Sequence, residues 1–172
     1  MFEYANERFY VGVDPSLTGF AIVIINQHGD IIEQKLIHTD AECYINIEQR
    51  LLDIFYQAKF VANIANMDML YIEDLSFMSK STSLWERIGL LYMIRTHLFK
   101  SNTNFEVKAP TALKKWHTTD GFATKTLMMQ VAKCKWGLDF EDDNICDAYC
   151  LARWALEDYE KCQKCQINQS SS

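Results

Sequence analysis

An aspartate at the end of an apolar strand constrains this chain more than any other feature of its sequence. Residues 9–13 are apolar and rich in strand-forming side chains, and Asp14 and Pro15 follow them directly. Pro15 cannot donate a hydrogen bond to a sheet, and Gly19 permits a tight backbone conformation, so the chain should turn back into a second strand over 20–26. A strand end holds a side chain rigidly, as a metal ligand must be held. A simple turn or cap role for Asp14 is the alternative.

The size and composition of the chain fit a single globular domain. Its 172 residues are 49% hydrophobic and 13% aromatic, which is enough to bury a substantial core. No apolar run is long enough to span a membrane and no signal pattern opens the chain, so we expect a cytoplasmic protein. The six cysteines are expected to be reduced thiols. We predict a flexible leader over 1–8, one domain over 9–160 and a disordered tail over 161–172.

The hydrophobic pattern predicts a mixed α/β sheet. Strand-like segments are short and apolar, whereas helical segments repeat their apolar residues every three to four positions. The strands are expected over 9–13, 20–26, 31–37, 69–72 and 105–107, and the helices over 40–66, 81–100, 112–116, 123–136 and 142–159. The first three strands should form an antiparallel meander, and the fourth should run parallel after a helical crossover.

Further acids stand where a metal site could use them. Glu73 ends the fourth strand, as Asp14 ends the first. Asp143 and Asp147 are four residues apart on the last helix, and Asn144 shares their face. Acids favour the first turn of a helix electrostatically, but this does not account for Asp147, which lies a turn further in among apolar residues. A carboxylate there needs a partner, and a cation is the natural one.

Asp14, Glu73 and Asp147 would meet if the first and fourth strands are neighbours. Clustered carboxylates repel one another unless divalent cations hold them, and their hard oxygen atoms suit Mg²⁺, with Mn²⁺ as a substitute. Two such ions activate water and stabilise the leaving oxygen of a phosphodiester. The acids therefore predict metal-dependent phosphodiester hydrolysis with two ions per site.

The basic residues are concentrated in the second half of the chain. The net charge is −6, but the stretch 80–135 holds ten basic and three acidic residues, a net +7 that leaves −13 for the remainder. Such asymmetry favours a basic binding surface beside an acidic metal site, because a phosphate polymer responds to the local surface. A solvated helical surface is the alternative.

Three segments together resemble the RuvC-type Holliday-junction resolvases of the RNase H-like superfamily. They are Val-Gly-Val-Asp14-Pro-Ser, Tyr-Ile-Glu73-Asp and Asp-Asn-Ile-Cys-Asp147-Ala, in this order. The resemblance implies an RNase H-like α/β fold, a five-stranded mixed sheet with three antiparallel and then parallel strands, flanked by helices on both faces. It implies metal ligands at Asp14, Glu73, Asn144 and Asp147. The family usually has Asp or His at the Asn144 position, so either Asn144 ligates through its carbonyl oxygen or Asp143 substitutes for it.

The segment from Lys108 to Lys125 resembles the basic loop and following helix of the same family. By that likeness Lys114 and Lys125 approach the scissile phosphate, Lys125 as a catalytic residue, and Lys115 is an alternative to Lys114. Phe77 stands one residue from the position of an aromatic wedge that unstacks bases at the junction; packing within a loop is the alternative. The predicted DNA-binding residues are Lys80, Lys108, Lys114, Lys115, Lys125 and Phe77.

The resemblance implies a magnesium-dependent homodimeric endonuclease that resolves four-way or other branched DNA junctions and leaves 5′-phosphates. The expected place of action is the cytoplasm of a bacterium or of a host infected by a phage. Another RNase H-like nuclease, acting on flaps or RNA–DNA hybrids, is one alternative. A structure-selective DNA-binding protein, in which Asn144 marks an impaired metal site, is the other. The residues themselves indicate metal-assisted cleavage beside a basic surface. They do not indicate four-way junctions or a partner motor.

Overall fold

A computed structural model describes the protein over residues 7–75 and 83–170. The elements are β1 (Phe9–Asp14), β2 (Gly19–Asn26), β3 (Ile31–His38), η1 (Ala41–Cys43), α1 (Ile47–Ala58), η2 (Lys59–Asn63), β4 (Met67–Glu73), α2 (Leu84–Lys100), β5 (Phe105–Lys108), α3 (Pro110–Thr118), α4 (Lys125–Trp136) and α5 (Asp143–Ser170). The strands form one sheet in the order β3-β2-β1-β4-β5.

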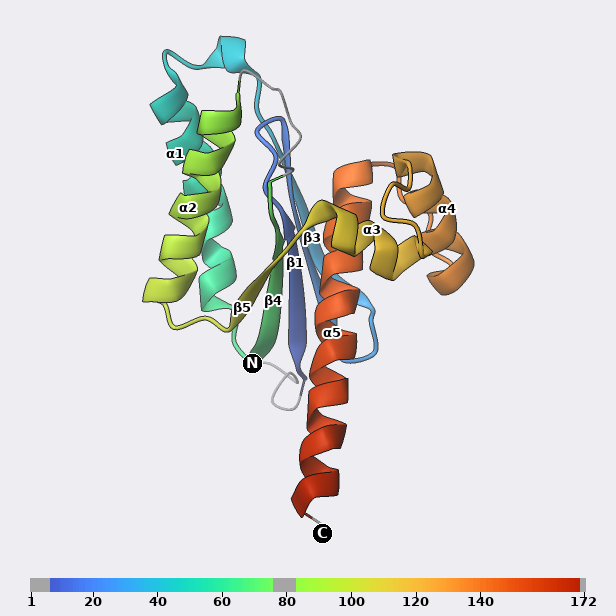
Figure 1. Ribbon diagram of the computed structural model, residues 1–172. Helices are drawn as coiled ribbons and strands as arrows, with labels where there is room; N and C mark the ends of the chain where they lie inside the picture. Colours follow the sequence, from blue (N-terminus) through green and yellow to red (C-terminus); the bar gives the residue numbers. More distant parts are fainter. Residues whose placement is uncertain (1–6, 76–82, 171–172) are drawn as a thin grey trace.

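The directions of the strands confirm the predicted mixed sheet. β1 pairs antiparallel with β2, and β2 with β3, whereas β4 runs parallel to β1 and β5 parallel to β4. Helices α1 and α2 cover one face of the sheet, and α5 covers the other with α3 and α4 beside it (Figure 1). This arrangement puts β1, the strand that carries Asp14, at the centre of the sheet.

The position of α5 depends on a glycine in β1. All residues of β1 are buried, because helices cover both faces of the sheet. Val11 and Val13 pack into the core under α1 and α2, whereas Tyr10 packs into the core under α5. A Cβ atom on Gly12 would lie 1.8 Å from the carbonyl oxygen of Ala148 in α5. Only glycine therefore lets α5 lie this close to the central strand.

The helix predicted over 40–66 is wrong in its extent. The structure divides this stretch into the short 3₁₀ helix η1, the helix α1 and the 3₁₀ helix η2. The Asp40 side chain accepts a hydrogen bond from the backbone N–H of Glu42, and the Asn46 side chain accepts one from that of Gln49. Each cap starts a helix of its own, so these two polar residues interrupt the apolar pattern.

The last helix is longer than predicted. α5 continues to Ser170, past the predicted end at Tyr159, and extends beyond the sheet (Figure 1). An ion pair of 3.9 Å between Lys164 and Glu160, four residues apart, accompanies the extra turns. The structure therefore shows helix through most of the tail that was predicted to be disordered over 161–172.

The N-terminal end of the described chain is attached to the domain. Of the predicted flexible leader over 1–8, the structure describes Glu7 and Arg8. The Arg8 guanidinium donates a hydrogen bond of 3.2 Å to the Tyr159 hydroxyl and forms an ion pair of 3.5 Å with Asp68. These contacts tie the residue before β1 to α5 and β4.

Two further expectations concern the cysteines and the membrane. All six cysteines are free thiols, as the sequence predicted. Cys146 and Cys150 are buried in α5, whereas the other four are exposed. Among the helices of the described residues, none has both the length and the apolar character needed to cross a lipid bilayer.

Candidate functional site

The ends of β1 and β4 lie side by side because the two strands are parallel neighbours. Asp14 is the last residue of β1 and Glu73 the last of β4, and the register pairs Val13 with Ile72. The N-terminal turns of α5, which contain Asp147, reach the same edge of the sheet. Three acids that are far apart in the sequence therefore meet, as predicted.

The three acids line one cleft of about 410 Å³. Its walls come from the turn between β1 and β2, the end of β4 and the N-terminal parts of α2, α3, α4 and α5. The lining residues are Asp14, Ser16, Leu17, Thr18, Glu73, Ser83, Arg87, Pro110, Lys114, Lys125, Asn144 and Asp147.

The surroundings of the three acids in the cleft disfavour their ionised forms and raise their pKa values. Burial raises the pKa of Asp14 to about 7; the charge of Asp147 adds to this rise, and Lys125 and Arg87 oppose it. Burial followed by the charge of Asp143 raises the pKa of Asp147 to about 6. Burial and then Asp14 raise the pKa of Glu73 well above its ordinary value. The cluster therefore favours binding of protons or of another cation.

The donor set suits a hard divalent cation in its chemistry. Carboxylate and amide oxygens are the ligands that Mg²⁺ and Mn²⁺ prefer. Within the described residues, however, no three His, Cys, Asp or Glu side chains are grouped closely enough to hold one metal ion. The structure thus brings Asp14, Glu73 and Asp147 to one cleft without a preformed metal cage. The metal ions remain a prediction.

The structure places Asn144 and Asp143 differently. Asn144 lines the cleft, and its Nδ2 donates a hydrogen bond of 3.2 Å to Oδ1 of Asp142. This orientation turns the amide nitrogen toward Asp142, so the carbonyl oxygen is the atom left for a ligand. Asp143 does not line the cleft, and its carboxylate is paired with the ammonium of Lys125. Asn144 thus lines the cleft and Asp143 does not, and which of the two completes a metal site stays a prediction.

Two of the predicted lysines stand at the cleft. Lys114 lies on α3, four residues after Pro110, and both residues line the cleft. The proline ring fits the first turn of a helix. Lys125 is the first residue of α4, which Thr124 caps by accepting a hydrogen bond from the backbone N–H of Leu127. Hydrogen bonding to Asp143 raises the pKa of Lys125 above its ordinary value, so the side chain stays charged.

Other predicted DNA-binding residues are not brought to the cleft. The Lys108 ammonium lies 4.0 Å from the centroid of the Tyr71 ring and 4.7 Å from that of Trp154, and it pairs with Glu106 at 2.7 Å. Placing Lys108 among the DNA-binding residues therefore finds no support in the structure. Lys115 is exposed on α3 but does not line the cleft. Phe77 and Lys80 lie outside the described residues.

Arg87 is a basic residue of the cleft that the sequence analysis left without a role. It lies in the first turn of α2 and lowers the pKa of Asp14 and Glu73 by its charge. One signal was available. A helix that follows the strand ending in Glu73 must start near the same sheet edge, so a basic residue in its first turn faces the acids. Ser16 and Thr18 reach the cleft by following Asp14 directly.

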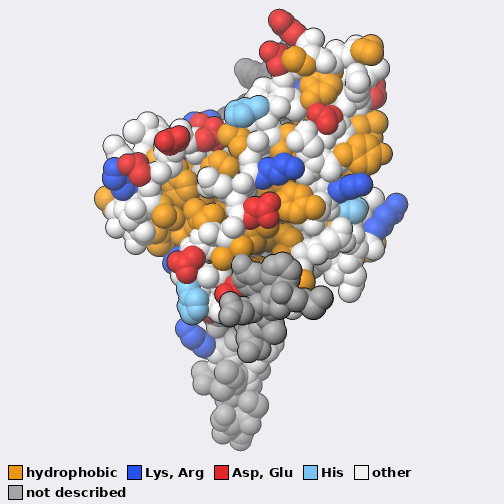
Figure 2. Space-filling view, turned by 180° about the vertical axis from the view of Figure 1, so that it is seen from behind, with side chains coloured by type: hydrophobic (Ala, Val, Ile, Leu, Met, Phe, Trp, Pro, Cys, Tyr) orange, Lys and Arg blue, Asp and Glu red, His pale blue; other side chains and the backbone are white. Residues whose placement is uncertain are grey.

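Figure 2 shows the face of the molecule that lies behind in Figure 1. Seen from behind, the hydrophobic side chains are interspersed with single basic and acidic ones, and neither sign of charge forms a continuous field (Figure 2). Within the described residues this face is no match for a phosphate backbone. The basic residues that line the cleft with the three acids are Lys114, Lys125 and Arg87.

The strand order and directions, with helices on both faces, define an RNase H-like fold. The solved structure of Thermus thermophilus RuvC has this fold, with a TM-score of 0.69 and 15% identity over 84% of this chain and 90% of that chain. T. thermophilus RuvC in complex with a Holliday junction substrate gives a TM-score of 0.67 and 15% identity, with the same coverage. The fowlpox virus Holliday junction resolvase gives a TM-score of 0.49 and 16% identity over 87% of this chain and 99% of that chain. The chain therefore has a RuvC-type fold.

Comparison of the sequence itself with protein-family models gives no match. Comparison with curated proteins gives none either. The likeness is thus one of structure, and it extends over most of the chain.

Proposed function

We propose that this protein is a metal-dependent endonuclease that cleaves four-way or other branched DNA. One observation carries the proposal: Asp14, Glu73 and Asp147 converge in a single cleft that Lys114 and Lys125 border. Acidic oxygen ligands beside basic side chains are what hydrolysis of a phosphodiester requires. The RuvC-type fold and the RuvC structure in complex with a Holliday junction substrate support DNA as the substrate class.

The proposed roles follow from where each side chain lies. Asp14, Glu73 and Asp147 would hold Mg²⁺ or Mn²⁺, with Asn144 contributing its carbonyl oxygen. Two bound ions would lower the pKa of a water molecule and neutralise the charge on the leaving oxygen. The lysines on α3 and α4 would contact the phosphate and orient it toward the acids. Hydrolysis would leave a 5′-phosphate.

The first experiment compares a labelled four-way junction with a linear duplex of the same sequences, in Mg²⁺ and in EDTA. We expect paired nicks near the crossover that need Mg²⁺, spare the duplex and disappear in Asp14→Asn, while junction binding persists. Equal cleavage by Asp14→Asn would refute the assigned site. Tight junction binding without incision in Mg²⁺ or Mn²⁺ would favour a DNA-binding protein, and preferred cleavage of flaps or hybrids would favour another nuclease.

The proposal includes a homodimer, because incision of both strands at a two-fold symmetric junction needs two sites related by the same symmetry. Helix α2 offers a surface for it. Trp85, Tyr92 and Phe99 are 78%, 57% and 78% exposed. They are spaced seven residues apart, so they follow one side of the helix. We propose that this aromatic stripe, Trp85, Tyr92 and Phe99, packs against the same helix of a second copy.

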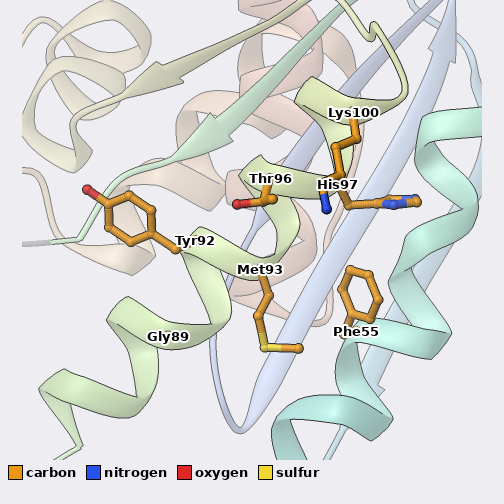
Figure 3. A pocket seen from close by; sticks show the side chains of 7 residues that line it. All are labelled: Phe55, Gly89, Tyr92, Met93, Thr96, His97 and Lys100. Carbon is orange, nitrogen blue, oxygen red and sulfur yellow. The ribbon is translucent and has the colours of Figure 1, made fainter.

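A groove beside the stripe supports the same interface. It has a volume of about 420 Å³ and lies between α1 and α2, where Phe55 and His97 face each other and Met93 lies nearby (Figure 3). The small residues Gly89 and Thr96 leave room in it for side chains of another helix. Sedimentation should give a dimer for the wild type and a monomer for Tyr92→Glu. Phe122→Glu, at a residue 85% exposed between α3 and α4 on the other side of the sheet, is the control. A monomeric wild type would refute the dimer.

A further inference from the structure

We propose that Arg50 is a positioning residue of the candidate active site. It lies on α1, does not line the cleft and holds the turn between β1 and β2 that forms the wall beside Asp14. This inference rests on the proposed nuclease function, because the position of the wall matters to a reaction only if the acids act on a substrate.

Arg50 is a buried cation whose bonded partners are neutral. Its side chain is 7% exposed. Its Nε donates to Oγ1 of Thr39 at 2.9 Å, and its Nη2 donates to the carbonyl oxygens of Leu17 at 2.9 Å and Thr39 at 2.8 Å. Among the described residues it has no carboxylate within ion-pair distance. Burying such a charge is costly. We infer that the role of this buried charge is to fix the backbone carbonyl groups to which it donates.

Within the turn that Arg50 holds, one backbone hydrogen bond of 3.1 Å joins the N–H of Ser16 to the carbonyl oxygen of Asp14, and the side-chain bonds are longer. Ser16 Oγ lies 3.4 Å from the backbone nitrogen of Thr18, which is at the long limit for a hydrogen bond. The carbonyl oxygen of Leu17, in the middle of the turn, accepts hydrogen bonds both from Arg50 and from the Thr39 hydroxyl. The middle of the turn, at the Leu17 carbonyl group, is therefore held from outside, by Arg50 on α1 and by Thr39 after β3.

A shift of this turn would change the shape of the cleft and so lower the rate of the proposed reaction. Ser16, Leu17 and Thr18 line the cleft, and they follow Asp14 in the chain without a break. A displacement of about 1 Å at a reacting group can cost about 100-fold in rate. Loss of the Arg50 donors should therefore lower kcat for junction cleavage by roughly tenfold to 100-fold. KM should change little, because the basic residues on α3 and α4 stay in place.

Four variants separate positioning from a general loss of stability. Arg50→Met keeps much of the volume and removes every donor, whereas Arg50→Lys keeps the charge and should restore part of the rate. Thr39→Val removes the hydroxyl that links Arg50 to Leu17, and it serves if Arg50→Met does not fold. Ile54→Val is the matched control: Ile54 lies one turn further along α1 and is fully buried, and its side chain has no donor or acceptor with which to hold the turn.

Two measurements are made on each variant: kcat and KM for the junction, and hydrogen exchange of the peptide that covers 15–19 in the absence of DNA. We expect faster exchange and lower kcat in Arg50→Met and Thr39→Val, and wild-type behaviour in Ile54→Val. Unchanged exchange, unchanged kcat, or an equal loss of kcat in Ile54→Val would overturn the proposal. If the wild-type protein cleaves nothing, the nuclease function fails, and the exchange data still show whether Arg50 holds the turn.

Discussion

Replacing Asp14 by asparagine should stabilise the metal-free protein while removing its response to metal. The Asp14 side chain is 8% exposed, and burial together with Asp147 raises its pKa from 3.8 to about 7. Among the described residues its carboxylate makes no ion pair that would compensate. Asparagine has nearly the same shape and carries no charge at any pH. The substitution therefore removes an electrostatic cost with little change in packing.

The magnitude follows from the difference in proton binding. The unfolded chain loses the Asp14 proton near pH 3.8 and the folded chain near pH 7, so the folded state binds more protons in between. The free energy of unfolding must then fall as the pH rises from about 4 to about 7. A tenfold change in acid dissociation is worth about 1.4 kcal/mol, so the full cost above pH 7 is about 4 kcal/mol. Because Asp147 and Glu73 share the repulsion, we expect Asp14→Asn to recover about 2–4 kcal/mol at pH 8.

Urea unfolding in EDTA at pH 4.5 and pH 8 measures this effect. The gain of Asp14→Asn should be large at pH 8 and small at pH 4.5. Asp139→Asn is the matched control, because Asp139 is exposed on the surface and pairs with Lys133 away from the cleft; it should change stability by less than about 0.5 kcal/mol. Mn²⁺ should raise the Tm of the wild type and leave that of Asp14→Asn unchanged. A less stable Asp14→Asn at pH 8 would show that the fold already satisfies this carboxylate, and would refute the reasoning.

Five other substitutions, four at lysines and one at Asn144, test the surroundings of the acids. Lys114→Ala and Lys125→Ala should each weaken junction binding, most at low salt, and reduce the slope of log K against log salt by about 1. Lys115→Ala, the control, should change this slope less. Unchanged slopes in a filter-binding titration would mean that the DNA binds elsewhere. Asn144→Asp adds a carboxylate to the cleft and should lower the Mn²⁺ concentration that gives half-maximal thermal stabilisation; no change would argue against Asn144 as a ligand. Lys108→Met should cost about 1–2 kcal/mol of stability through its lost contacts with two aromatic rings, with junction binding intact; weakened binding in an electrophoretic assay would restore Lys108 to the DNA surface.

The acids of the site could be predicted from the sequence because strand ends and helix periods are local properties. Asp14 and Glu73 each follow a short apolar strand, and parallel neighbours must end at one edge of a sheet. Asp147 could be singled out because the ordinary preference for acids at a helix start does not extend to its position. These arguments need only the sequence near each residue and the order of the elements.

The basic residues could not be assigned in the same way, because their roles depend on distant partners. From the sequence, Lys108 was expected to be free to bind DNA. In the fold, its ammonium group lies against the rings of Tyr71 and Trp154. Arg50 reads as one polar residue of an amphipathic helix, yet it is buried against Leu17. No local pattern distinguishes a lysine that meets DNA from one that meets a tryptophan.

The glycines show how local and distant requirements combine at the site. Gly19 follows Asp14 and Pro15 and was predicted to permit a tight turn, but it is not among the residues with a positive φ. Its role lies in packing, since a Cβ atom there would lie 2.7 Å from Nδ2 of Asn144. Gly12 makes the same allowance for α5 one strand away. The distance between Asp14 on β1 and Asp147 on α5 therefore depends on Gly12, where a Cβ atom would meet the backbone of α5, and Gly19 leaves room for the Asn144 side chain. The site thus depends on residues that carry no chemistry themselves.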